Sequence, residues 1–230
     1  MNIAIVGATG NVGRKTLEVL EKKGLTLGNL YLVASSKSAG KKIHFQGKDI
    51  VVSELENFDF SKVKIAFFAA GGKISEKFAE KAAKHCLVID NSSFFRMDPD
   101  VPLIVPQVNS DALNNIKKNI IANPNCSTAQ LVIALKPLHD LFVIKRIVVS
   151  TYQSVSGAGK ASMDELIKQT KLALDGKDIK SENFTKPIAF NAIPHIDVFS
   201  EDGYTKEELK MRNETKKILD DKIDLTATCV

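Results

Sequence analysis

Three glycines near the N-terminus separate an apolar segment from a helical pattern, and this order constrains the fold more than any other feature of the chain. Residues 2–6 (Asn-Ile-Ala-Ile-Val) predict a buried strand, and residues 14–23 predict a helix with one apolar face. Gly7, Gly10 and Gly13 lie between them. A strand that passes through a glycine turn into a helix is typical of dinucleotide-binding folds, where N–H groups at the helix start bind phosphate. The spacing is G-x-x-G-x-x-G rather than G-x-G-x-x-G, so the pyrophosphate contacts are expected to differ from the usual ones, and an ordinary tight turn is the alternative.

Strands and helices continue to alternate through the first half of the chain. Apolar segments predict further strands at 30–34, 50–52, 65–69, 86–90, 103–105 and 120–122, and the pattern of 73–84 predicts a helix. This alternation predicts an α/β protein whose N-terminal part is a Rossmann-like, doubly wound parallel sheet. Ligands of such sheets bind at the carboxyl ends of the strands.

The pattern changes after a helix predicted at 127–139. There follow a strand at 145–155, a helix at 160–175, a lysine-rich surface loop at 176–187, a charged helix at 205–221 and a strand at 225–230. We therefore expect two domains, a Rossmann-like dinucleotide-binding domain at 1–126 and an α+β domain at 127–230. The second is expected to be incomplete, because the chain ends within its last predicted strand.

Charge and cysteine content narrow the function classes. The net charge of +5 comes from scattered lysines without a block of like charges, which favours anionic small molecules over nucleic acid as partners. No segment has the pattern of a signal peptide or the apolar length of a membrane span. The three cysteines are widely spaced and form neither a zinc pattern nor a disulfide framework, so we expect a cytoplasmic protein with no metal site. Cys86 and Cys229 are expected to be packing residues.

The third cysteine, Cys126, lies where a loop turns into a helix. Residues 123–128 (Asn-Pro-Asn-Cys-Ser-Thr) precede the apolar run 129–135. At a helix start, unpaired N–H groups and the macrodipole favour a thiolate over a thiol, and the same N–H groups can hold an oxyanion. We therefore predict a cysteine nucleophile, and the alternative is an inert cysteine that fills space.

The end of the second predicted strand bears on the choice of cofactor. A cofactor with a free 2′-hydroxyl is usually met there by Asp or Glu, whereas this chain has Ser35, Ser36, Lys37 and Ser38. Hydroxyl groups and an ammonium suit a 2′-phosphate, so NADP is favoured over NAD, with a solvated serine turn as the alternative.

Six sequence blocks, in order, resemble the aspartate-semialdehyde dehydrogenase family over the whole chain. They are residues 7–13, 69–72 (Ala-Ala-Gly-Gly), 90–98 (Asp-Asn-Ser-Ser-Phe-Phe-Arg-Met-Asp), 123–128, 153–159 (Gln-Ser-Val-Ser-Gly-Ala-Gly) and 207–216. The resemblance implies reversible, NADP- and phosphate-dependent conversion of L-aspartate 4-semialdehyde to 4-aspartyl phosphate. It also implies a role in lysine, threonine and methionine biosynthesis.

The resemblance further assigns roles to residues. It implies that Cys126 is the acyl-thioester nucleophile, that Gln153 orients the substrate, and that Glu207 meets the substrate amino group. Arg96 and Lys210 match phosphate contacts, and Asn91 and Asn125 match the substrate site. Cofactor positions are Gly7, Thr9, Gly10, Asn11, Val12, Ser36, Lys37, Ser38, Gly71, Ser156 and Gly157. The alternatives are purely structural roles. Arg96 would cap a loop through Asp98 or Asp100, and Glu207 and Lys210 would form a surface pair at i, i+3.

The family continues well beyond Val230, with a substrate-carboxylate arginine and a general-base histidine. We therefore expect a C-terminally truncated and poorly active chain that is a homodimer at full length. Two other functions stay open, namely a non-catalytic NADP-binding fragment and a related acyl-phosphate or acyl-CoA reductase.

Overall fold

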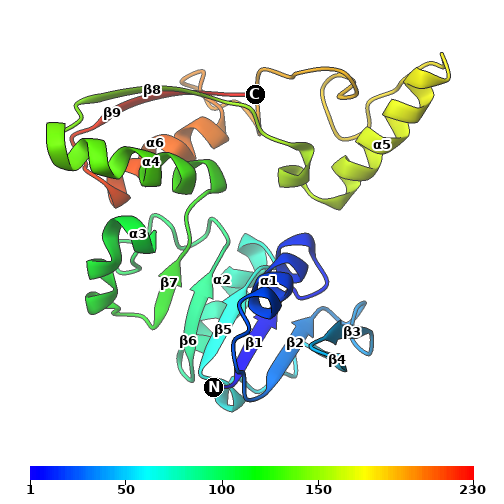
Figure 1. Cartoon of the computed structure of the whole chain (residues 1–230), viewed down its shortest axis with the longest axis vertical. Helices are drawn as coiled ribbons and strands as arrows, with labels where there is room; N and C mark the ends of the chain where they lie inside the picture. Colours follow the sequence, from blue (N-terminus) through cyan, green and yellow to red (C-terminus); the bar gives the residue numbers. More distant parts are fainter. The chain divides into compact units, whose positions relative to one another are not determined.

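The computed structural model describes all residues from 1 to 230, and they form two compact units (Figure 1). The first comprises Met1–Pro137 with Lys217–Leu219, and the second comprises Leu138–Lys216 with Asp220–Val230. This division differs from the predicted boundary at 126/127. Residues 126–137 of the helix Cys126–Phe142 belong to the first unit, and Val132 is fully buried in that unit's core.

A seven-stranded sheet organises the first unit. Its strands are β1 (Ile3–Val6), β2 (Leu30–Ala34), β3 (Lys42–Phe45), β4 (Lys48–Glu54), β5 (Ile65–Phe68), β6 (Leu87–Asp90) and β7 (Ile120–Ala122). The spatial order is β3-β4-β2-β1-β5-β6-β7, and every pair except β3–β4 is parallel. The order reverses at β1, so the predicted doubly wound parallel sheet is confirmed.

Alternate residues of β1 pack against helices on opposite faces of the sheet. Ile3 and Ile5 of β1 are buried with Leu17 and Leu20 of α1 (Asn11–Lys22). The intervening residues of β1 share the second core with α2 (Gly72–Ala83) and with α4 (Cys126–Phe142). Figure 1 shows α1 and α2 on opposite sides of the strands. Both faces are covered, which explains why β1 is apolar throughout.

Short elements complete the first unit. They are the 3₁₀ turns η1 (Phe60–Lys62) and η2 (Ser110–Asn115) and the single-turn helix α3 (Pro106–Asn109). Residues 103–105, predicted as a strand, form only an isolated bridge from Leu103 to Ala122.

The edge strand β3 is absent from the sequence-based prediction. It forms a hairpin with β4 through Gln46 and Gly47, whose φ angles of 47° and 76° are the positive values that a two-residue hairpin turn requires. Only Phe45 of β3 is buried, so its apolar pattern is too short to stand out in the sequence.

The second unit contains a two-stranded parallel sheet and two long helices. Its elements are β8 (Arg146–Thr151), η3 (Val155–Ala158), α5 (Lys160–Leu174), α6 (Lys206–Ile218) and β9 (Asp224–Cys229), with β8 pairing to β9. Met211 of α6 is fully buried, and its sulfur lies 3.7 Å from the Cys229 Sγ of β9, so the helix packs on the sheet.

A buried polar pair on α5 holds the segment that follows it. The Glu165 carboxylate accepts hydrogen bonds from the backbone N–H groups of Glu182 and Asn183, and the Gln169 Oε1 accepts those of Ile188 and Ala189. Residues 176–187, predicted as a surface loop, are therefore tied to α5 by backbone hydrogen bonds.

No helix in the structure is both long enough and apolar enough to cross a bilayer.

Candidate functional site

The loops that carry the predicted site residues of the first unit follow the carboxyl ends of its parallel strands. Gly7 follows β1, Ser35 follows β2, Ala69 follows β5 and Asn91 follows β6. Cys126 lies beyond the end of β7. Because these strands are parallel, their carboxyl ends share one edge of the sheet, where ligands of such folds bind.

The glycine turn after β1 cannot accept side chains at two of its positions. Gly7 has φ +88°, and a Cβ there would lie 2.7 Å from the Ala69 carbonyl oxygen. A Cβ on Gly13 would lie 2.7 Å from the Ala8 Cα and closer still to the Gly7 carbonyl oxygen. The turn therefore brings α1 close to β1 with exposed backbone at its start, as a phosphate-binding turn requires.

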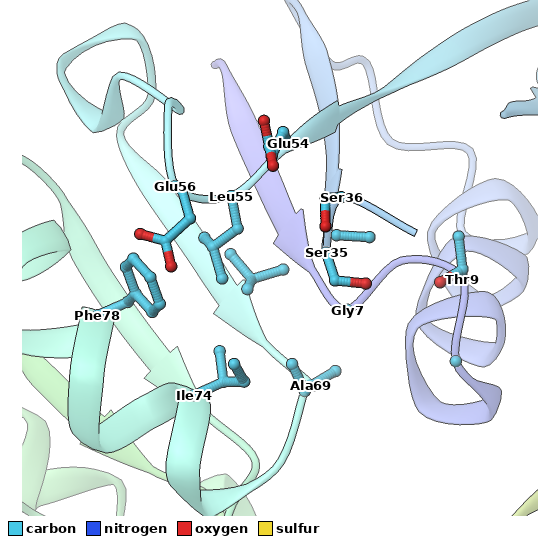
Figure 2. Close-up of a pocket in the computed structure, with 14 residues that line it drawn as sticks. Gly7, Thr9, Ser35, Ser36, Glu54, Leu55, Glu56, Ala69, Ile74 and Phe78 are labelled. Atoms are coloured by element: carbon cyan, nitrogen blue, oxygen red, sulfur yellow. The ribbon is translucent and has the colours of Figure 1, made fainter. Parts of the chain in front are cut away.

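A pocket of about 460 Å³ opens beside this turn (Figure 2). Figure 2 shows the serines and Thr9 on one side and Ile74 and Phe78 of α2 on the other. The lining residues are Val6, Gly7, Thr9, Gly10, Ala34, Ser35, Ser36, Glu54, Leu55, Glu56, Ala69, Ala70, Ile74 and Phe78. The pocket thus joins a polar side next to the glycine turn with an apolar side, which suits a nucleotide.

Of the predicted cofactor residues, Gly7, Thr9, Gly10 and Ser36 line this pocket. The Thr9 Oγ1 lies 3.4 Å from the Ser38 Oγ, so the glycine turn contacts the serine turn directly. Lys37 is exposed in that turn. The other predicted residues of this unit do not line the pocket: Asn11 and Val12 lie in the first turn of α1, and Gly71 is the N-cap of α2.

Sequence reasoning missed the wall formed by Glu54, Leu55, Glu56, Ile74 and Phe78. Glu54 ends β4, whose neighbour in the sheet is β2. The position of Glu54 two residues beyond the strand predicted at 50–52 was the available signal, but only the strand order places β4 next to β2.

Cys126 is the first residue of α4, and its side chain is exposed. The Asn125 Oδ1 accepts hydrogen bonds from the backbone N–H groups of Ser127 at 2.9 Å and Thr128 at 3.3 Å, so Asn125 caps the helix. This corrects one expectation: these two N–H groups are occupied by the cap and do not hold an oxyanion. The predicted position of the thiol at a helix start is nevertheless observed.

Asn91 and Arg96 brace the loop before Cys126. The Asn123 Nδ2 donates to the Asn91 Oδ1 at 2.6 Å. The buried Arg96 guanidinium donates to the Asn123 carbonyl at 2.9 Å and to the Asn91 carbonyl at 3.2 Å. Arg96 therefore joins the loops after β6 and β7, beside the thiol, while Asp98 and Asp100 pair with lysines of their own.

The other two cysteines differ from Cys126. Cys86 and Cys229 are buried, and burial raises the pKa of both thiols, to about 11 for Cys86. A raised pKa suppresses the thiolate, so both behave as the packing residues that the sequence predicts. No three His, Cys, Asp or Glu side chains gather where a metal ion could bind.

In the second unit, three predicted substrate residues form one cluster. The Gln153 Nε2 donates to the Glu207 Oε1 at 3.2 Å, and the Lys210 Nζ donates to the Glu207 Oε2 at 3.0 Å. The Lys210 Nζ also donates to the Asp197 Oδ2 at 3.0 Å. Glu207 is only 9% exposed, so the two residues form a partly buried cluster and not the surface pair that was the alternative. No sequence signal pointed to Asp197.

Two remaining predicted cofactor residues, Ser156 and Gly157, are exposed in η3 of the second unit. The Ser154 side chain caps this turn by accepting from the Ser156 N–H.

The comparisons with known proteins agree with this architecture. Residues 2–116 match the family described as "Semialdehyde dehydrogenase, NAD binding domain", and residues 135–230 match "Semialdehyde dehydrogenase, dimerisation domain". The chain is 54% identical to the aspartate-semialdehyde dehydrogenase of Aquifex aeolicus, over 99% of this chain and 68% of that protein.

Solved structures are similar as well. A crystal structure of aspartate semialdehyde dehydrogenase II from Vibrio cholerae, complexed with ASA, has a TM-score of 0.96 at 52% identity and covers 99% of this chain and 69% of that one. The enzyme from Candida albicans with NADP has a TM-score of 0.68 at 27% identity, covering 99% and 66%. The chain therefore belongs to the aspartate-semialdehyde dehydrogenase family, with a nicotinamide-dinucleotide-binding domain followed by a dimerisation domain.

Proposed function

We propose that the chain catalyses the NADP-dependent oxidation of L-aspartate 4-semialdehyde to 4-aspartyl phosphate through a thioester on Cys126, as a step of amino-acid biosynthesis. The observation that carries this proposal is the exposed Cys126 thiol at the start of α4, on the sheet edge that also holds the glycine turn. A nucleophile and a dinucleotide site on one edge are what an oxidation by covalent catalysis needs.

The Cys126 thiolate adds to the aldehyde carbon, which forms a C–S bond and an alkoxide. NADP, when bound, would supply the acceptor for the hydride that leaves the former aldehyde carbon, and the alkoxide electrons would re-form the C=O bond as a thioester. An oxygen of inorganic phosphate then attacks the thioester carbonyl carbon, the C–S bond breaks, and the thiolate leaves with the acyl phosphate released. The Asn125 cap holds the first turn of α4, where Cys126 lies, in place during both steps.

The glycine turn supports dinucleotide binding, because no side chain fits at Gly7 or Gly13. Gly7, Thr9, Gly10 and Ser36 would contact the cofactor in the pocket of Figure 2. The preference for NADP is supported by the exposed Lys37 beside Ser36 and Ser38, since an ammonium and hydroxyls complement a 2′-phosphate.

The other roles are those that the family resemblance implies, and the charges of the side chains support them. Gln153 would orient the substrate, Glu207 would bind its ammonium group, and Lys210 would bind the anionic phosphate. Asn91 and Arg96, which brace the loop before Cys126, would bind phosphate or substrate. The match of residues 135–230 to a dimerisation domain supports a homodimer.

Single-turnover oxidation tests the proposal. The chain is mixed with NADP and the semialdehyde without phosphate, NADPH is followed by absorbance, and the protein mass is measured. We expect up to one equivalent of NADPH and a covalent acyl adduct on the peptide that contains Cys126. Cys126→Ala should abolish both while keeping NADP affinity within a few-fold, and Cys86→Ala is the matched control.

Other outcomes identify the alternatives. NADP binding without any NADPH burst would indicate a non-catalytic cofactor-binding fragment. An equal or larger burst with other semialdehydes would indicate a related acyl-phosphate or acyl-CoA reductase. Equal effects of the Cys126 and Cys86 variants would refute the assignment of the nucleophile.

A further inference from the structure

The pocket of Figure 2 has a carboxylate in its wall that comes from the end of β4, that of Glu54. β4 pairs in parallel with β2, where Glu54 is in register with Ala34, and the Leu55 N–H donates to the Ala34 carbonyl at 2.8 Å. The serine turn begins at the next residue, Ser35. Glu54 is therefore fixed beside the serine turn, one strand further from β1.

One oxygen of the Glu54 carboxylate is held by the protein. The Asn57 Nδ2 donates to the Glu54 Oε2 at 2.9 Å, and the residue is partly buried. The Glu54 Oε1 is left as an acceptor for a ligand, because an ionised carboxylate accepts hydrogen bonds and donates none.

The second glutamate of the pocket wall differs from Glu54. The side chain of Glu56 is 56% exposed, and its Oε1 accepts from the Lys77 Nζ at 2.5 Å. Its charge is therefore both solvated and paired, so Glu54 is the better placed of the two to select a hydrogen-bond donor.

Apolar side chains lie next to this acceptor in the same pocket. Leu55 and Phe78 are each 5% exposed, and Ile74 packs against the core that contains them. Apolar walls suit the flat faces of an aromatic ring, while a polar group beside them can hydrogen-bond to the edge of the ring. The combination suits a planar base that carries a donor on its edge.

The strand order indicates which base of a dinucleotide would lie here. The glycine turn follows β1, with β2 and β4 on one side of it and β5, β6 and β7 on the other. Cys126 lies beyond the end of β7. Nicotinamide has to face the Cys126 thiol for hydride transfer, so the adenosine half would extend toward β2 and β4. The base beside Glu54 would then be adenine, whose 6-amino group is a hydrogen-bond donor.

We propose that Glu54 is a specificity-determining residue, whose carboxylate accepts a hydrogen bond from the 6-amino group of adenine and so selects 6-aminopurine dinucleotides over 6-oxopurine ones. This inference rests on the proposed function, in which NADP binds at the glycine turn. A 6-oxo group places an acceptor where the amino group has a donor. The carboxylate then loses a hydrogen bond and faces a second oxygen.

Glu54→Gln isolates the acceptor. Glutamine has nearly the same shape, and its oxygen can accept the Asn57 N–H, which leaves its NH₂ group for the ligand. A donor at this place suits a 6-oxo group and no longer suits a 6-amino group. Glu56→Gln is the matched control, because it removes the same charge from the wall of the same pocket, at a residue paired with Lys77.

Calorimetric titrations of the full chain test the proposal with NADP and with its 6-oxopurine analogue, nicotinamide hypoxanthine dinucleotide phosphate. We expect the wild type to bind NADP at least about fivefold more tightly than the analogue, a size set by a hydrogen bond to a charged group that is only partly buried. Glu54→Gln should abolish or reverse this preference, and Glu56→Gln should keep it.

Equal affinities of the wild type for the two dinucleotides would overturn the proposal. An unchanged preference in Glu54→Gln would do so as well, and if that variant changed only the ratio of NADP to NAD affinity, its carboxylate would face the ribose instead. An equal loss of preference in Glu56→Gln would also overturn it, because the effect would then be one of pocket charge. Binding of neither dinucleotide would refute the proposed function itself, whereas equal binding of both refutes this inference alone.

Discussion

Replacing Lys217 by Met should destabilise the loop that carries Arg96. Lys217 lies in the last turn of α6. Together with the next two residues, it belongs to the first unit, although the rest of α6 belongs to the second. Its Nζ donates to the carbonyl oxygens of Arg96 at 2.8 Å, Asp98 at 2.7 Å and Val101 at 2.8 Å. All three N–H donors are therefore used, and methionine would leave three carbonyls without them.

The magnitude follows from these three hydrogen bonds. A hydrogen bond to a charged group contributes about 1.5–3 kcal/mol. Burial lowers the pKa of Lys217, which shows that desolvation of the ammonium offsets part of that sum. Water can also reach carbonyls on a loop, so we expect a net loss of about 2–4 kcal/mol in the free energy of unfolding.

Urea unfolding at pH 7 measures this loss. With an m-value of about 2 kcal/mol/M, the midpoint for Lys217→Met should fall by about 1–2 M. Lys216→Met is the control on the same helix, and its free energy of unfolding should stay within about 0.5 kcal/mol of the wild type. A change of less than about 0.5 kcal/mol for Lys217→Met would refute the reasoning, because it would mean that water replaces the ammonium at no cost.

Three further predictions concern the cofactor site and a buried thiol. Gly13→Ala should weaken NADP binding at least about tenfold by fluorescence titration, because the new Cβ would overlap the backbone at Gly7 and Ala8 and push α1 away from β1; unchanged affinity would contradict the close approach. Lys37→Glu should shift the NADP/NAD affinity ratio toward NAD by about fivefold or more, since a carboxylate repels a 2′-phosphate; a constant ratio would mean that the 2′-phosphate pocket is elsewhere. Burial raises the pKa of the Cys86 thiol to about 11, whereas the ordinary value of 9.0 applies in the unfolded chain. The protonated thiol therefore contributes fully to stability below pH 9, and this contribution is lost as the pH rises from 9 to about 11. Urea unfolding across that range should therefore show a smaller loss in Cys86→Ala than in the wild type, and parallel curves would rule out the buried thiol as the cause.

Local patterns predicted much of the first unit. The continuous apolar run of β1 and the glycines after it lie next to each other in the sequence, so both the strand and the turn could be inferred from neighbouring residues. The position of Cys126 at a helix start was predictable for the same reason. The hairpin strand β3 was not, because it has one buried residue and depends on β4 for its hydrogen bonds.

Contacts between residues that are far apart in the sequence could not be predicted from such local patterns. Asn125 could be identified as a residue of the site, but its use as a helix cap, which occupies two N–H groups, required coordinates. The cluster of Gln153, Asp197, Glu207 and Lys210 brings together residues from three separate segments.

The sequence alone determined the alternation of strands and helices, the glycine turn and the family, since these depend on residue order and on local spacing. Tertiary structure decided which strands are neighbours, and so brought Glu54 into the pocket beside the serine turn. It also decided that the Lys217 ammonium serves three carbonyls and that Asp197 shares Lys210. The physical reason is that hydrogen bonds and charge pairs act over a few ångströms in space, whatever the separation along the chain.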